Sequence, residues 1–420
     1  MRFKTLADWL AWQEALHPKS IDLGLFRVKK VYERLGRRGP MPYTITVGGT
    51  NGKGSCVAML DAILRRQGYR VGTYTSPHLL RYNERICIDG EPVGDDPICD
   101  AFERIDRVRD DTTLSFFEFG TLAALDIFAA ADLDVQVLEV GLGGRLDAVN
   151  IVDANAALIA SIDLDHQDWL GDTRTAIGLE KAGIFRPGKP AVIGDIDVPA
   201  AVVQYAEEHG VPLSWLGRDF TYEMLGGGWN WIGRDARLDN LPLPALQGVH
   251  QMMNASAVLE TLHRIEHDVP VSAVSIRDGL KNVSLAGRFQ YIPGSVPVLL
   301  DVAHNPQAVK VLADYLRSRF EGKTIHAVFA VMRDKDISGI VNNIKDLIQD
   351  WYLAPLQMSR AATAEQLLAV FDSFGVSAVR AGFADAAAAF DAAKRDAATD
   401  HLVLVFGSFF LVSEYLAHMS

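Results

Sequence analysis

The chain has 420 residues, more than one hydrophobic core usually supports, so its length predicts two domains. Its formal net charge of −12 argues against a nucleic-acid-binding protein, because such proteins need a basic surface to displace the counterions of the phosphates. Any anionic substrate must therefore be held in a local cationic pocket.

The cysteines and the apolar runs indicate where the protein works. Cys56, Cys87 and Cys99 lack metal-type spacing, and an odd number of thiols suits a reducing compartment. The N-terminal stretch, with Asp8 and Glu14, lacks the basic start and apolar core of a secretory signal. No apolar run approaches the ~20 residues that a membrane helix needs. We therefore expect a cytoplasmic protein that binds no membrane and buries its cysteines as small apolar side chains.

Two amphipathic helices are predicted before the first strand. Apolar side chains recur at helical spacing from Leu6 to Leu16 and again from Asp22 to Leu35. Asp22 can be the N-cap of the second helix, because a short acidic side chain accepts hydrogen bonds from the first N–H groups.

A glycine-rich loop follows the first strand. Tyr43 to Val47 alternates β-branched residues, Gly48 to Ser55 reads Gly-Gly-Thr-Asn-Gly-Lys-Gly-Ser, and apolar residues from Cys56 to Leu64 recur at helical spacing. Glycines let backbone N–H groups converge on an anion, the helix N-terminus adds its dipole, and Lys53 supplies a positive charge. The stretch is therefore predicted to bind the phosphates of a nucleotide.

The loop departs from the usual G-x-x-x-x-G-K-[ST] pattern. Val47 stands where the first glycine belongs, and Gly54 follows Lys53, so that the hydroxyl is delayed to Ser55. The alternative is a glycine-rich turn with an exposed lysine. The strand and the helix on either side favour the phosphate loop.

Side chains that can bind a metal ion or a substrate lie at or after the ends of three further predicted strands. Ser76 and His78 come after the predicted strand Val71 to Thr75, at the edge where open α/β sheets bind ligands, although Ser76-Pro77 can equally be an ordinary turn. Glu139 lies near the end of an apolar strand, and a carboxylate is costly to bury there unless a cation or proton compensates. His166 follows the next strand. Mg²⁺ needs few protein ligands, so Glu139 and His166 predict a sparse magnesium site.

Two helix segments leave a structural alternative open. Phe116 and Phe117 open a helix just before Glu118, and they can be core packing or a flat apolar wall for a ring-shaped ligand. Gly178 to Gly188 reads as a helix that ends at a glycine. On composition alone, Lys181 would lie on the surface of that helix.

The second domain is predicted to begin near Gly287, which gives domains of residues 1–287 and 288–420. Strands and helices alternate from Val296 to the final strand Leu402 to Phe406, which predicts a second, smaller parallel α/β unit. Asp301 ends its first strand. Asp301 can be a turn residue, and Asn305 can be the N-cap of the helix that starts at Pro306.

Taken together, these motifs resemble the folylpolyglutamate synthetase branch of the Mur ligase superfamily, and within it the bifunctional bacterial dihydrofolate synthase/folylpolyglutamate synthases. The resemblance covers nearly the whole chain. The motifs that carry it are Ile21-Asp22-Leu23-Gly24, Gly49 to Ser55, Thr75 to Leu79, Glu139 to Asp147, Asp165-His166, Glu180 to Ile184, Gly287-Arg288 and Asp301 to Pro306.

The resemblance implies an α/β fold with an N-terminal P-loop domain, a Rossmann-like C-terminal domain and an active site between them. It implies ATP at Thr50, Asn51, Gly52, Lys53, Asn254, Arg288 and Asp301, and magnesium, as two ions, at Ser76, Glu139 and His166. It further implies that Lys181 is carboxylated on its side-chain nitrogen, and that a pterin contacts Asp22, Leu23, Gly24, Ser115, Phe116, Phe117, Glu118, Leu146, Asp147 and Ala148.

The implied reaction is the ATP-dependent addition of L-glutamate to dihydropteroate and to tetrahydrofolate and its polyglutamates. A substrate carboxylate attacks the γ-phosphate, and the amine of glutamate then attacks the acyl phosphate, so that ADP and phosphate leave. Lys53, Lys181 and His304 are the expected catalytic residues, and a monomer is expected. The alternatives are a Mur-type cell-wall amino-acid ligase, against which Gly54 weighs, and a nucleotide-dependent switch protein without enzymatic activity.

Overall fold

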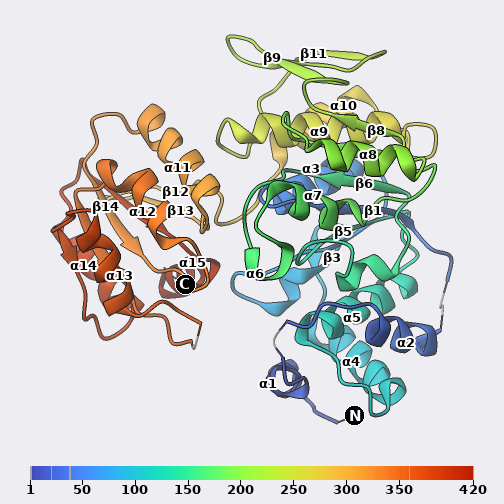
Figure 1. The fold of residues 1–420 in the computed structure, drawn as a ribbon, viewed down its shortest axis with the longest axis horizontal. Helices are drawn as coiled ribbons and strands as arrows, with labels where there is room; N and C mark the ends of the chain where they lie inside the picture. Colours follow the sequence, from blue (N-terminus) through green and yellow to red (C-terminus); the bar gives the residue numbers. More distant parts are fainter. Residues whose placement is uncertain (1, 20, 37–38, 359, 420) are drawn as a thin grey trace. The chain divides into compact units, whose positions relative to one another are not determined.

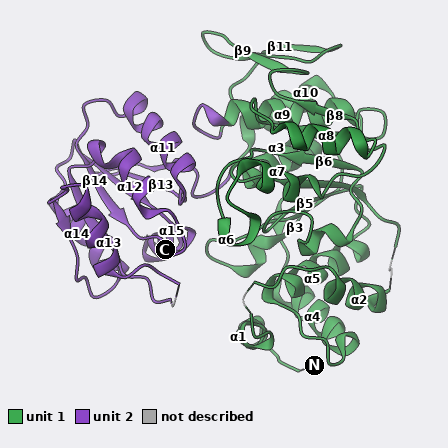
Figure 2. Cartoon of the chain, in the orientation of Figure 1, with its two compact units in different colours: residues 1–245, 251–284 green, residues 246–250, 285–420 purple. Residues whose placement is uncertain are grey.

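The computed structural model describes residues 2–19, 21–36, 39–358 and 360–419. The chain forms two compact units (Figure 2). Unit 1 contains Met1–Ala245 and Gln251–Ser284, and unit 2 contains Leu246–His250 and Leu285–Ser420. The chain thus crosses between the units more than once.

Unit 1 is built on an eight-stranded sheet in the order β4-β3-β2-β5-β1-β6-β7-β8. Only the pairs that involve β3 are antiparallel; β2, β5, β1, β6, β7 and β8 pair in parallel. The strands are β1 (Tyr43–Gly48), β2 (Val71–Tyr74), β3 (Ile86–Ile88), β4 (Glu91–Pro92), β5 (Val135–Glu139), β6 (Ala156–Ile159), β7 (Ala191–Ile193) and β8 (Leu213–Trp215).

Ten α-helices belong to the described part of unit 1, and they cover both faces of this sheet (Figure 1). They are α1 (Leu6–Leu16), α2 (Phe26–Leu35), α3 (Lys53–Gln67), α4 (Asp95–Arg109), α5 (Phe116–Ala130), α6 (Gln167–Leu170), α7 (Arg174–Ala182), α8 (Ala200–Glu208), α9 (His250–Arg264) and α10 (Ala273–Asn282). Helices α3 and α10 pack closely, since a Cβ atom on Gly279 would come within 2.5 Å of Ile63. A separate three-stranded antiparallel sheet consists of β9 (Thr221–Met224), β10 (Trp229–Ile232) and β11 (Arg237–Leu241).

The second predicted helix begins later than its sequence pattern indicates. Helix α2 starts at Phe26, and Leu25 is its N-cap without a side-chain hydrogen bond. The prediction of a helix from Asp22, with Asp22 as its cap, is therefore wrong. The carboxylate of Asp22 accepts hydrogen bonds from the side chains of His17 and Arg27 instead.

Unit 2 is a six-stranded sheet in the order β12-β13-β17-β14-β15-β16, parallel except for the edge pair β12–β13. Its strands are β12 (Gln290–Ile292), β13 (Val298–Asp301), β14 (Ile325–Phe329), β15 (Asp350–Leu353), β16 (Val379–Arg380) and β17 (Leu402–Phe406). Its helices are α11 (Pro306–Arg319), α12 (Ile337–Ile344), α13 (Ala364–Ser373), α14 (Ala386–Asp396) and α15 (Phe409–Met419). The expected fold class, a P-loop α/β unit followed by a smaller α/β unit, is confirmed.

Among the described residues, no helix is long and apolar enough to cross a membrane.

Candidate active site

The glycine-rich loop joins the central strand β1 to helix α3. Gly49 and Gly52 have φ angles of +143° and +85°, in a region that residues with a side chain rarely adopt. The Nζ atom of Lys53 donates to the carbonyl oxygens of Gly49 and Thr50 at 2.9 and 3.2 Å. The ammonium group therefore lies over the loop, where the phosphates of a nucleotide would lie.

The loop is fixed to the segment that follows strand β6. Thr50 Oγ1 donates to the carbonyl oxygen of Asp163 and accepts from its N–H, both at 3.0 Å. Asn51 N–H donates to Ser161 Oγ at 3.0 Å, and this hydroxyl donates back to the carbonyl oxygen of Asn51 at 3.0 Å. The sequence did not reveal the role of Ser161, because a serine after a strand carries no signal for a partner 110 residues away.

Two of the three predicted metal ligands lie together. Glu139 ends strand β5, is 5% exposed, and accepts a hydrogen bond from the backbone N–H of Ser76 at 3.2 Å. Strands β2 and β5 are neighbours in the sheet, which brings the loop after β2 to the end of β5. A hydroxyl and a buried carboxylate are oxygen donors of the kind that Mg²⁺ prefers, so these residues fit a magnesium ion.

His166 is the third predicted ligand. It caps the short helix α6 with a left-handed backbone at φ 53°, and its N–H donates to Asp165 Oδ1 at 2.8 Å. Its strand, β6, is separated from β5 only by β1, so His166 follows the same edge of the sheet. In the described part of the chain, no cluster of three or more His, Cys, Asp or Glu side chains could hold a metal. The predicted set contains only two such side chains.

Lys181 is buried, at 3% exposure, so the composition-based expectation of a surface lysine is wrong. Burial, and secondarily the charge of Lys53, lowers the pKa of Lys181 to about 7, against a smaller opposite effect of Asp165. The charge of Lys53 and that of Asp165 thus act on the buried Lys181 amine in opposite directions.

Three segments that were predicted to contact a pterin meet in unit 1. Gly24 N–H donates to the carbonyl oxygen of Leu146 at 3.3 Å. Arg27 donates to Asp22 Oδ2 at 2.6 Å and to Glu118 Oε1 at 3.1 Å. Burial would raise the pKa of Asp22, but the hydrogen bond from His17 and the charge of Arg27 lower it overall. Arg27 was missed by sequence reasoning, because helical spacing alone makes it a surface residue.

Two of the residues predicted to contact a pterin also stabilise the start of a helix. Ser115 and Glu118 form a capping box at the start of α5, in which Ser115 N–H donates to Glu118 Oε2 at 2.7 Å and Glu118 N–H donates to Ser115 Oγ at 3.3 Å. The rings of Phe116 and Phe117 are half-buried. The Phe117 ring lies against Gly141, where a Cβ atom would come within 2.6 Å of it.

Asp147 stabilises the turn that contains Leu146 and Ala148, the third of the segments predicted to contact a pterin. Its carboxylate, 2% exposed, accepts from Leu142 N–H at 2.8 Å and from Val149 N–H at 3.1 Å. Burial raises the pKa of Asp147 to about 7, against the effect of these hydrogen bonds. The side chain fixes the positions of Leu146 and Ala148 on either side of it.

In unit 2, the end of strand β13 carries a buried carboxylate. Asp301, 5% exposed, accepts from Phe289 N–H at 3.0 Å and from Ala303 N–H at 2.9 Å. Burial raises the pKa of Asp301 to about 6, although the charge of Arg288 opposes the shift. The guanidinium carbon of Arg288 lies 4.9 Å from the centre of the Phe409 ring.

His304 and Asn305 follow Asp301. His304 Nδ1 lies 2.9 Å from the carbonyl oxygen of Val302, to which it must donate, so this nitrogen carries a hydrogen. Asn305 is the N-cap of α11 and accepts from Ala308 N–H, which confirms its predicted capping role.

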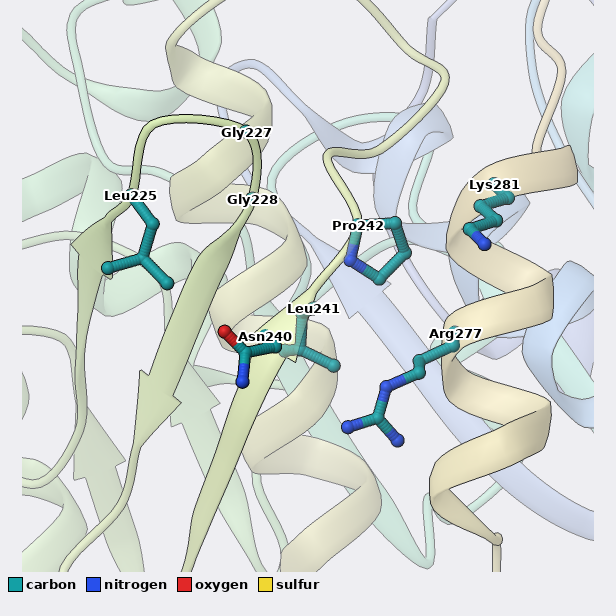
Figure 3. Close-up of a pocket in the computed structure, with 8 residues that line it drawn as sticks. All are labelled: Leu225, Gly227, Gly228, Asn240, Leu241, Pro242, Arg277 and Lys281. Carbon is teal, nitrogen blue, oxygen red and sulfur yellow. The ribbon is translucent and has the colours of Figure 1, made fainter.

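One open pocket lies away from the loop. It has a volume of about 470 Å³ and lies between the β9–β11 sheet and α10, where Arg277 and Lys281 line one side and Asn240 and Pro242 the other (Figure 3). Arg277 uses its guanidinium to donate to the carbonyl oxygen of Asp239 at 2.8 Å. None of the predicted site residues lines this pocket.

Relatives with known names align with nearly the whole chain. Residues 287–409 match the family model described as Mur ligase, glutamate ligase domain. The dihydrofolate synthase/folylpolyglutamate synthase of Escherichia coli K12 is 44% identical over 98% of this chain and 94% of its own length.

Solved structures agree over a similar length. The structure of Escherichia coli FolC in complex with DHPP and ADP is 43% identical, has a TM-score of 0.93, and covers 99% of this chain and 98% of its own. A bifunctional folylpolyglutamate synthase/dihydrofolate synthase structure with Mn, AMPPNP and L-glutamate bound is 42% identical with a TM-score of 0.91, at 99% and 98% coverage.

Proposed function

The chain belongs to the dihydrofolate synthase/folylpolyglutamate synthase family, and we propose that it adds L-glutamate to dihydropteroate and to tetrahydrofolate and its polyglutamates. The observation that carries this proposal is the alignment with the Escherichia coli enzyme, which is 44% identical and extends over at least 94% of both chains. A relative that shared only the nucleotide-binding unit would not align from end to end.

The reaction is an ATP-dependent acid–amine ligation. A carboxylate is a poor electrophile, so its oxygen first attacks the γ-phosphorus of ATP, which forms an acyl phosphate and releases ADP. The amine of glutamate then attacks the acyl carbon, loses a proton, and expels inorganic phosphate. Phosphoryl transfer asks the protein chiefly for positioning and charge neutralisation, and the ammonium of Lys53 at the start of α3 suits that task.

We assign the nucleotide to Thr50, Asn51, Gly52, Lys53 and Asn254 of unit 1 and to Arg288 and Asp301 of unit 2. In unit 1, the assignment is supported by the left-handed glycines, by the ammonium over the loop, and by Asn254, which contacts Gly52. In unit 2, Arg288 supplies a positive charge and Asp301 a fixed acceptor. His304 follows Asp301 and is assigned to substrate orientation.

Ser76, Glu139 and His166 are proposed to hold magnesium, as two ions. When bound, magnesium would neutralise phosphate charge. The buried carboxylate of Glu139 beside Ser76 is the feature that fits this cation. The structural relative with Mn bound is consistent with a divalent metal.

Lys181 is proposed to be carboxylated at Nζ. The ammonium first loses a proton; the neutral amine then attacks CO₂, a C–N bond forms, and a second proton is released, so that the cation becomes a carbamate anion. A pKa of about 7 makes the neutral amine abundant near pH 7, and the nearby charge of Lys53 favours an anion at this position. A carbonyl signal from ¹³C-bicarbonate that disappears in Lys181→Met would test the modification by NMR.

The pterin is proposed to contact Asp22 to Gly24, Ser115 to Glu118 and Leu146 to Ala148. The link from Arg27 to Asp22 and Glu118 supports one shared site for these segments. We further propose a cytoplasmic monomer whose ATP-binding and ligase domains divide at 287/288. The start of the Mur ligase match at residue 287 supports that boundary, and sedimentation equilibrium tests the monomer.

The mechanism is tested with dihydropteroate whose carboxylate carries ¹⁸O. Attack on ATP by that carboxylate predicts that one ¹⁸O per turnover appears in the released inorganic phosphate. Label that stays entirely in the product would rule out the acyl phosphate.

A further inference from the structure

The delayed hydroxyl of the phosphate loop has an unexpected partner. In the usual loop, the hydroxyl that directly follows the lysine binds Mg²⁺. Here Gly54 takes that position, and Ser55 is 2% exposed, with its Oγ accepting a hydrogen bond from Gln251 Nε2 at 3.2 Å. The hydroxyl of Ser55 therefore joins helix α3 to helix α9.

Gln251 lies in the first turn of α9 and is 1% exposed. Its other amide atom, Oε1, accepts a hydrogen bond from Asn254 Nδ2 at 3.0 Å. One buried amide thus bridges Ser55, on the loop helix, and Asn254, three residues further along α9. Buried amides of this kind are costly to leave without partners, so the bridge restricts both neighbours.

The bridge determines which end of the Asn254 amide faces the loop. A Cβ atom on Gly52 would lie 2.6 Å from Asn254 Oδ1 and 3.2 Å from its Nδ2. Because Nδ2 donates to Gln251, the oxygen is the atom turned toward Gly52. The acceptor oxygen of Asn254 is therefore the amide atom nearest to the phosphate loop at Gly52.

We propose that Gln251 is a positioning residue of the nucleotide site, which holds the Asn254 amide with its oxygen toward the loop and ties α9 to α3 through Ser55. The inference rests on the proposed function, because it takes the loop as the site of ATP. It assigns Gln251 no contact with the nucleotide. Gln251 affects the affinity for ATP by fixing the orientation of the Asn254 amide.

The chain offers a matched control. Gln13, on α1 of the same unit, is also 1% exposed, and neither amide atom of its side chain has a hydrogen-bond partner among the described residues. Gln13→Leu removes a buried amide of the same size without touching the loop. We expect it to leave nucleotide affinity unchanged, whereas Gln251→Leu should weaken it about tenfold, the scale of one lost hydrogen bond.

The experiment measures the dissociation constant of AMPPNP with Mg²⁺ by calorimetry on the full chain, alongside steady-state kinetics. For Gln251→Leu we expect a tenfold higher Kd and a raised KM for ATP, with kcat at saturating ATP and the KM for glutamate nearly unchanged. Gln251→Met keeps a side chain of similar length and volume and removes both hydrogen bonds, so it should show the same loss of affinity as Gln251→Leu. It also provides a folded variant if the leucine variant unfolds.

A double-mutant cycle separates positioning from a general loss of packing. If Gln251 acts through Asn254, then Gln251→Leu should weaken AMPPNP binding when Asn254 is present. The same substitution should have no effect on binding when it is combined with Asn254→Ala. Additive losses, or unchanged affinity in Gln251→Leu and Gln251→Met, would overturn the inference alone. A wild-type protein that does not bind AMPPNP would overturn the nucleotide assignment as well.

Discussion

The two units differ in the charged groups that they bury at the ends of their parallel strands. At the ligand edge of unit 1, the buried amine of Lys181 lies near the ammonium of Lys53. In unit 2, the strand end carries a buried carboxylate, Asp301, fixed by the backbone N–H groups of Phe289 and Ala303. The edge of unit 1 therefore combines amines, which suit anions, with the Glu139 carboxylate, which suits a cation, whereas Asp301 in unit 2 is held by hydrogen-bond donors.

The difference explains how an acidic chain handles anionic substrates. The net charge of −12 belongs to the whole sequence, while Lys53 lies over the phosphate loop and its charge acts on Lys181. Local placement therefore decides binding here, and the overall charge does not. Variants at the sheet edge of unit 1 should change the rate of the reaction, and a variant at Asp301 in unit 2 should change its dependence on pH.

The largest effect is expected at the loop. Lys53→Ala removes the ammonium that we propose to face the phosphates, and kcat/KM for ATP should fall about 1000-fold, equivalent to about 4 kcal/mol. Steady-state ADP release measures this, with Lys29→Ala on exposed helix α2 as the control. A loss of less than tenfold would remove Lys53 from phosphoryl transfer.

Lys181→Met should separate activity from stability. We expect about a 100-fold lower kcat, because the proposed carbamate cannot form, and an unfolding free energy for the ligand-free protein that is not reduced, since burying an ammonium is costly. Urea denaturation and ADP release measure the two quantities, and Lys189→Met at an exposed position is the control. Lower stability together with wild-type activity would contradict a catalytic role for this buried amine.

Asp301→Asn probes the edge in unit 2 through pH. The raised pKa of about 6 means that Asp301 becomes protonated as the pH falls through 6, so wild-type kcat/KM for ATP should decline tenfold per pH unit below that value. The asparagine variant should show about a tenfold lower value at neutral pH and no decline with this pKa. A variant with the wild-type profile would show that Asp301 does not bind ATP.

The smallest effect is expected for Thr50→Val, which removes both hydrogen bonds to Asp163 and keeps the shape of the side chain. We expect the unfolding free energy to fall by about 1–2 kcal/mol and the KM for ATP to rise a few-fold. Urea denaturation and ATP titrations check this against Thr221→Val on the exposed β9 strand. An unchanged variant would mean that the loop needs no anchor at Asp163.

Local sequence patterns predicted the parts of the fold that depend on near neighbours. Alternating β-branched residues before Gly48 and helical spacing after Ser55 identified the strand, loop and helix correctly, because these periods follow from backbone geometry. Glu139 stood out because an acidic residue in an apolar strand is costly, and the structure buries it beside Ser76. The capping role of Asn305 followed from its position before Pro306.

Features that depend on distant parts of the chain could not be predicted in this way. Lys181 occupies an ordinary helical position, and only the packing of α7 against the rest of unit 1 buries it. Arg27 and Gln251 gain their partners from segments 91 and 196 residues away. The start of α2 at Phe26 has a local cause that helical spacing does not reveal, because His17 and Arg27, each five residues away, take the Asp22 carboxylate and it does not cap the helix.

The most direct test of the assignment is ADP release by the purified protein with Mg-ATP and L-glutamate, with dihydropteroate, tetrahydrofolate or a UDP-linked muramyl precursor as the acceptor. We predict release with both pteridines and none with the muramyl compound. Release with only one pteridine would restrict the enzyme to a single synthase activity. Turnover of the muramyl compound, with neither pteridine active, would contradict the folate assignment.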